Sequence, residues 1–228
     1  MEVSERWYRN LESDMGAPLT PETLQRLSDA LALGLDERLA LYRHVHVNAD
    51  PVAPGPEGQE QALATLTHLL ATHEQYPAYV VDHAWNMLDY TGPMATWFPW
   101  VREPEANLLR WALTTPTARE QITEWPRHAA LYLAQLRFSL ATSRNNRQLG
   151  EILDEVLQDR ECRRLWEQDA KVIAYRQRNS FRLRIPHVAS GDIVVTSQVL
   201  LPAYRQDLRY VLLLPESDSA TPRSQERQ

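Results

Sequence analysis

The apolar positions in the first 47 residues follow the 3.6-residue period of amphipathic helices. Ser4 can act as the N-cap of a first short helix, and Thr20 followed by Pro21 predicts the start of a second one. Gly34 is expected to end that second helix, and a third is predicted over residues 36–47. The apolar side of the first helix consists of Val3, Trp7, Tyr8 and Leu11. Residues 1–47 therefore predict a small all-α unit.

The rest of the chain changes between helical and strand patterns. Proline and glycine gather in residues 48–59, which predicts a linker, and a helix follows over residues 60–74. Two short strands are predicted near 78–82 and 85–90, then helices over 91–175, and then three strands within 181–214. We expect one α+β domain over residues 60–215, with a five-stranded sheet interrupted by a large helical insert. The polar residues 216–228 predict a disordered tail.

Composition narrows the class of protein. With 43% hydrophobic and 24% charged residues the chain is typical of a globular protein, and its net charge of −6 argues against general electrostatic coating of nucleic acid. A lone cysteine, Cys162, excludes an intrachain disulfide framework. The sequence has neither a signal peptide nor a membrane-spanning apolar run, which predicts a cytoplasmic location without membrane contact. It contains none of the common catalytic, metal-binding or phosphate-binding motifs, so we predict no enzyme activity, no metal and no cofactor.

Four stretches resemble the ligand-binding domain of MmyB-like transcription regulators, a PAS-like domain common in actinobacterial regulators. They are "YPAYVVDHAWNMLDY", "NLLRWALTTPTAREQITEWPRHAALYLAQLR", "ECRRLWEQDAKV" and "DLRYVLLLP", and they occur in this order between residues 76 and 215. The resemblance implies an antiparallel PAS-like sheet. It also implies an apolar, fatty-acid-like small-molecule ligand held between that sheet and its helices.

The opening "VSERWYRNLE" resembles the recognition helix of the XRE type of helix-turn-helix, and "LTPETLQRLSDALAL" resembles the helix after it. This resemblance implies a DNA-binding transcription regulator, in which the recognition helix lies in the major groove. Its DNA-contacting residues would be Ser4, Glu5, Arg6 and Asn10 near the bases and Arg9 at a phosphate. An XRE domain has two further helices before the recognition helix, so we interpret this one as partial and N-terminally truncated. The alternative is a ligand-sensing or protein-interaction module that has lost DNA binding and packs on a partner or, as a homodimer, on a second copy.

Candidate ligand-binding residues come from a stretch rich in aromatic side chains. Large aromatic residues suit the walls of an apolar pocket, and they also suit a domain core, so both interpretations stay open. Two arginines in the stretches that resemble the MmyB-like family are candidates for orienting a ligand head group. The predicted residues are Trp85, Tyr90, Trp97, Trp111, Trp125, Arg110 and Arg119.

Overall fold

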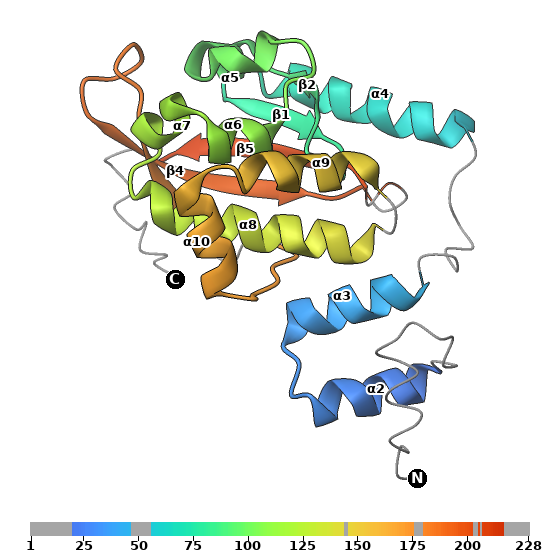
Figure 1. Cartoon of the computed structure of the whole chain (residues 1–228). Coiled ribbons are helices and arrows are strands. Elements are labelled where there is room, and N and C mark those ends of the chain that lie inside the picture. Colours follow the sequence, from blue (N-terminus) through green and yellow to red (C-terminus); the bar gives the residue numbers. More distant parts are fainter. Residues whose placement is uncertain are drawn as a thin grey trace, which may run out of the picture.

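The computed structural model of the chain describes residues 20–46, 56–143, 146–175, 180–202, 205 and 207–216 (Figure 1). The predicted first helix and its five DNA-contacting candidates lie outside these residues. So does most of the predicted tail. The first tail residue, Glu216, is described, and its carboxylate accepts hydrogen bonds from Ser180 and Thr196.

In the described part of the chain, two helices precede the α+β domain. Helix α2 (Pro21–Ala30) begins as predicted, because the Thr20 hydroxyl caps it and Pro21 occupies the first turn. It ends before Gly34, since Ala32 already adopts a left-handed backbone with φ of 51°. Helix α3 (Leu35–His46) follows, and the Gly34 N–H donates to the Glu37 carboxylate at its start, 2.7 Å away.

A five-stranded antiparallel sheet forms the centre of the domain. Its strands are β1 (Ala78–Val81), β2 (Met87–Tyr90), β3 (Ser180–Arg184), β4 (Asp192–Leu200) and β5 (Arg209–Pro215). They pair in the order β2-β1-β5-β4-β3, so strands distant in sequence, β1 and β5, become neighbours. All four residues of β1 are buried, which requires cover on both faces of the sheet.

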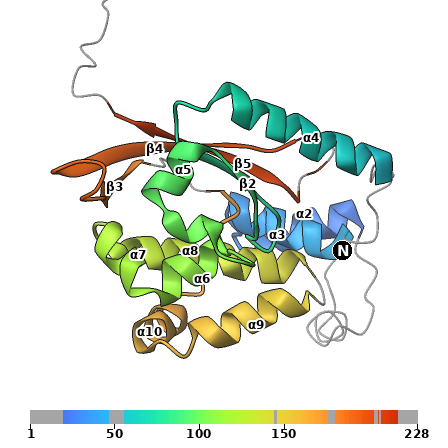
Figure 2. The same ribbon diagram turned by 90° about the horizontal axis from the view of Figure 1, so that it is seen from above.

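One face of the sheet carries most of the helical insert. The insert contains α5 (Gly92–Trp97), the 3-10 helix η1 (Pro99–Arg102), α6 (Leu108–Thr114), α7 (Pro116–Gln121), α8 (Trp125–Thr142), α9 (Arg147–Val156) and α10 (Arg160–Gln168). Helices α5 to α10 lie on one side of the sheet (Figure 2). They share the main hydrophobic core with inward-facing strand residues such as Val81, Leu183 and Leu213.

The opposite face is covered by α4 (Pro56–Thr72), as Figure 2 shows. Leu66 and Leu70 of α4 pack on Ala78, Val80 and Tyr210 of the two central strands. Helix α4 starts at Pro56, a residue of the predicted linker, since proline is well tolerated in the first turn of a helix. None of the helices in the described ranges combines the length and apolar character needed to cross a membrane.

The predicted α+β class, with two strands, a helical insert and three strands, is confirmed. One strand boundary was wrong. The second strand begins at Met87 rather than Trp85, because the Asp82 carboxylate accepts from the backbone N–H groups of Ala84 and Asn86 and holds a turn there. Trp85 sits in that turn with a left-handed φ of 69°.

Candidate ligand-binding site

A cavity of about 300 Å³ lies between the sheet and α8. This volume is at the lower end of the range typical of small-molecule pockets. The strands β1, β3, β4 and β5 supply one wall, and α6, α8, the residues after α10 and the turn before β2 supply the other. Its lining residues are Tyr79, Trp85, Leu108, Tyr132, Gln135, Ala174, Tyr175, Phe181, Ser197, Gln198, Val199, Leu201, Arg209, Val211 and Leu213. The walls combine apolar and aromatic side chains with the polar groups of Gln135, Ser197, Gln198 and Arg209.

Arg209 is the charged side chain in this lining, and it is only 8% exposed. Its guanidinium carbon lies 4.2 Å from the centre of the Trp85 ring, and its Nη1 donates to the Asp82 carbonyl over a long 3.4 Å. No carboxylate of the described residues forms an ion pair with it. Burial lowers the pKa of Arg209, which is the direction expected for a cation with little compensation. The cavity therefore contains a buried positive charge with unused hydrogen-bonding capacity.

Trp85 is placed against Arg209 by the same turn that ends β1. The Asp82 carboxylate holds the turn, and the backbone carbonyl of Asp82 accepts a hydrogen bond from Arg209. On the helix side, Trp85 Nε1 lies 3.4 Å from Ser139 Oγ of α8, within the buried core. The predicted ligand residue Trp85 is thus positioned between the sheet and α8, in the cavity wall.

The other predicted arginines bind carboxylates away from the cavity. Arg110 of α6 holds Glu155 of α9 with two hydrogen bonds of 2.6 and 2.9 Å. Arg119 of α7 lies 3.6 Å over the ring of Trp125 and forms ion pairs of 2.8 and 2.9 Å with Asp159 and Glu161. Trp125 also donates from Nε1 to the Ala112 carbonyl at 2.7 Å. These contacts join helices of the insert to one another.

The remaining predicted aromatic residues are also outside the lining of this cavity. Trp111 stacks on Trp100 with ring centres 5.0 Å apart, beside an outer groove of about 820 Å³. Trp97 is buried next to Phe98, and Tyr90 packs against the edge of the main core. Of the seven predicted ligand residues, the cavity brings in Trp85 alone.

Arg209 is the residue that the sequence analysis missed. It stands in the quoted stretch "DLRYVLLLP", directly before an apolar run. Since the apolar run predicts a strand buried on both faces, a charge at its start was the available signal. The pairing of β5 with β1, which puts Arg209 opposite Val81, could not be inferred from that stretch.

The thiol of Cys162 has no reactive environment. It is fully buried on α10, and Sγ donates to the Leu113 carbonyl at 3.3 Å. Burial raises its pKa to about 12, so the thiol stays protonated at neutral pH.

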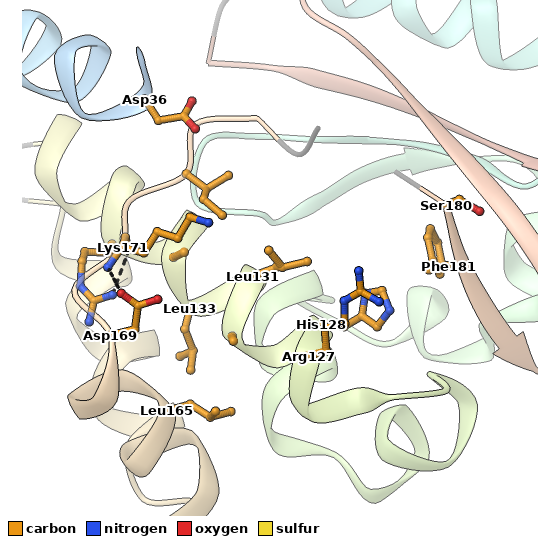
Figure 3. Close-up of a pocket in the computed structure, with 14 residues that line it drawn as sticks. Asp36, Arg127, His128, Leu131, Leu133, Leu165, Asp169, Lys171, Ser180 and Phe181 are labelled. Carbon is orange, nitrogen blue, oxygen red and sulfur yellow. Dashed lines mark hydrogen bonds between the residues drawn. The ribbon is translucent and has the colours of Figure 1, made fainter. Parts of the chain in front are cut away.

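A second hollow, of about 640 Å³, lies on the outer side of α8 (Figure 3). Asp36 of α3 lines it at one end, and Phe181 of β3 at the other. Charged side chains surround it, among them Arg127, Asp169 and Lys171. Phe181 also lines the inner cavity, so the two hollows adjoin. The inner cavity is the stronger candidate for a ligand site, because it lies between the sheet and α8 and its one charged lining residue, Arg209, is buried.

The sheet, its helical cover and the cavity between them have the architecture of a small-molecule-binding domain. Residues 63–226 match the family described as MmyB-like transcription regulator ligand binding domain, and the chain belongs to this family. A search of curated proteins finds no match.

Proposed function

We propose that the chain is a DNA-binding transcription regulator whose sensor domain binds an apolar small molecule with an acidic head group, such as a fatty acid. Arg209 carries this proposal. It is a buried cation in an apolar cavity, without an ion-pair partner among the described residues. The family, that of regulator ligand-binding domains, favours a sensor over an enzyme.

The protein's own side chains leave the charge of Arg209 largely uncompensated. Burying a charge is costly unless it is paired and hydrogen-bonded, and Arg209 has one long hydrogen bond and one ring contact. A carboxylate accepts two hydrogen bonds from a guanidinium in a favourable fork geometry. An acyl chain attached to that carboxylate would occupy the apolar walls. A molecule with both parts complements the cavity better than a plain hydrocarbon.

The ligand part is tested by isothermal titration of the delipidated full chain with sodium myristate, 1-tetradecanol and methyl myristate. The three probes share one chain length and differ in the head group. We expect myristate to bind at least about tenfold more tightly than the alcohol, because only the carboxylate is charged. Equal affinities for the acid and the alcohol, or no saturable binding of myristate, would contradict the proposal.

The DNA part is supported by the family and by the two helices before the sensor domain. A gel shift of the full native protein with the DNA upstream of its own gene, with and without myristate, tests it. We expect a shift whose midpoint moves when the lipid is added. A native protein that is inert toward this DNA would contradict it.

A second candidate is a sensor that acts through protein contacts, and two observations favour it. Leu31 and Leu35, at the α2–α3 turn, are 51% and 77% exposed, as at a docking surface. Residues 20–46 also carry four acidic and three basic side chains, with Arg38 paired to Asp29, so this part offers little charge for phosphates. A concentration-dependent dimer that Leu35→Ser disrupts would favour this candidate over DNA binding.

A further inference from the structure

Phe181 of β3 stands where the two hollows meet. Its side chain lines both the inner cavity and the outer hollow. On the outer side it packs against His128 of α8, with ring centres 5.9 Å apart and ring planes at 62° (Figure 3). His128 is buried, whereas Phe181 is half-buried. The Phe181 ring is thus part of the partition between the two spaces.

The other part of the partition comes from the segment after α10. Ile173 lines the outer hollow, and the next residue, Ala174, lines the inner cavity. The Ile173 N–H donates to the Ala134 carbonyl of α8 at 3.2 Å, and Ala174 is buried in a cluster with Phe138 of α8. Backbone hydrogen bonding and packing therefore fix this part. Phe181, on the edge strand β3, closes its part with one half-buried side chain, which a ligand can displace more easily.

The strand pairing places Phe181 and Arg209 at opposite ends of the cavity floor. Arg209 is the first residue of β5, and Pro215 is the last. Pro215 pairs with Val195 of β4, which in turn pairs with Phe181. Between these ends, alternate residues of β5 face the same side as Arg209, and they line the cavity as Val211 and Leu213. A ligand whose carboxylate lies at Arg209 therefore points its chain toward Phe181.

The inner cavity is small for a long acyl chain. Its volume of about 300 Å³ corresponds to about ten groups of the size of a water molecule, at about 30 Å³ each. A methylene group is of similar size, so an acid of about eight to ten carbons fills this space. Beyond Phe181 a chain would enter the outer hollow, which is bordered by the charged side chains of Arg127, Asp169 and Lys171 (Figure 3). Further methylenes should therefore add little affinity.

We propose that Phe181 is a specificity-determining residue that limits the well-bound acyl chain to about eight to ten carbons. The inference rests on the proposed acidic ligand held by Arg209, and it adds which acids fit the site. The ring closes the inner cavity at the end away from Arg209. A longer chain has to push the ring out of its contact with His128. Myristate still binds through its carboxylate, but its last methylenes contribute little.

The test is isothermal titration of the delipidated full chain with sodium octanoate, decanoate, dodecanoate and myristate. In the wild type we expect affinity to rise about threefold to fourfold per methylene up to decanoate, and by less than about threefold in total from decanoate to myristate. Phe181→Ala leaves the space of the phenyl ring for the end of the chain. Myristate should bind this variant at least about tenfold more tightly than the wild type, while octanoate should gain nothing. Phe181→Leu, which keeps more of the packing, should shift myristate in the same direction by less.

Leu165→Ala is the matched control, because Leu165 lines the outer hollow but not the inner cavity. It should leave the dependence on chain length as in the wild type. A wild-type affinity that rises by the same factor per methylene up to myristate overturns the limit, and so does an unchanged myristate affinity in both Phe181 variants. Decanoate that binds more tightly than 1-decanol upholds the acidic ligand in either case. Absence of saturable binding by all four acids overturns the proposed ligand and the limit with it.

Discussion

Two arginines of this protein stack on tryptophan rings in very different surroundings. Arg119 lies 3.6 Å over Trp125 and is paired with Asp159 and Glu161. Arg209 lies 4.2 Å over Trp85, and among the residues that the structure describes no carboxylate pairs with it. The Arg119 side chain is 30% exposed, whereas Arg209 as a residue is only 8% exposed. The more deeply buried cation has the fewer partners.

The difference indicates which arginine has a structural role. The charge of Arg119 is already neutralised by two carboxylates, so it fastens α7 to α10 and has little to offer a ligand. Arg209 is costly for the fold and has capacity left for an anion. The signal available in the sequence, a place in a stretch that resembles the MmyB-like family, is the same for both arginines. What separates them is the set of acidic neighbours, which only the fold brings into position.

The largest expected effect is on ligand affinity. Arg209→Met keeps an apolar side chain of similar reach and removes the charge. We expect myristate to bind more weakly by about 2–5 kcal/mol, because a buried carboxylate would lose its charged partner. The free energy of unfolding of the empty protein should stay within about 1 kcal/mol of the wild type or rise, since an uncompensated charge is gone. Calorimetric titration and urea unfolding measure the two quantities.

Arg119→Met is the matched variant for that affinity measurement and should bind myristate as the wild type does. If Arg119→Met weakened binding and Arg209→Met did not, the assignment of the two arginines would be reversed.

The next largest expected effect is on the stability of the fold, at the ion pair between Arg119 and Asp159. The Asp159 carboxylate accepts from the N–H groups of Glu161 and Cys162 at the start of α10, both at 2.9 Å, and pairs with Arg119. Asp159→Ala should lower the free energy of unfolding by about 1–2 kcal/mol, through loss of the helix cap and of the ion pair. Urea unfolding measures it, with Asp154→Ala on the exposed side of α9 as the control. A loss equal to that of the control would contradict the structural role.

Arg119→Met should have a smaller effect on stability, about 1 kcal/mol. It removes a ring contact and two partly exposed ion pairs, while the cap of α10 stays in place. The same unfolding experiment measures it. A loss greater than that of Asp159→Ala would show that the ring contact with Trp125 dominates.

Much of the fold could be predicted from local patterns. Proline and threonine marked the start of α2, and alternation and apolar runs marked the strands. The boundary before Met87 was missed because the Asp82 turn depends on side-chain hydrogen bonds that the strand pattern does not report.

The candidate site was less predictable. Aromatic density identified Trp85 together with four aromatic residues that lie outside the cavity lining, and the family resemblance added two arginines that also lie outside it. The decisive residue, Arg209, comes from the last strand, and its role depends on the pairing of β5 with β1 across more than 100 residues. Sites assembled by such distant pairing leave little signal in a single sequence.

The smallest expected effect is a pH dependence of the stability that Asp159 contributes through its ion pair with Arg119. Burial alone would raise the pKa of Asp159, but the N–H groups of Cys162 and Glu161 and the charge of Arg119 outweigh it and lower the pKa. Since the folded pKa is below the unfolded one, this carboxylate stabilises the fold above the unfolded pKa, and the contribution is lost as the pH falls below about 4.

Asp159→Asn keeps a good helix cap and removes the charge. Near pH 7 it should be less stable than the wild type by about 0.5 kcal/mol, because the ion pair is partly exposed, and the gap should close by about pH 2. Urea midpoints at the two pH values measure this gap, and in an Arg119→Met background the gap near pH 7 should shrink. A gap that is the same at both pH values would mean that the cap, rather than the charge, distinguishes aspartate from asparagine here.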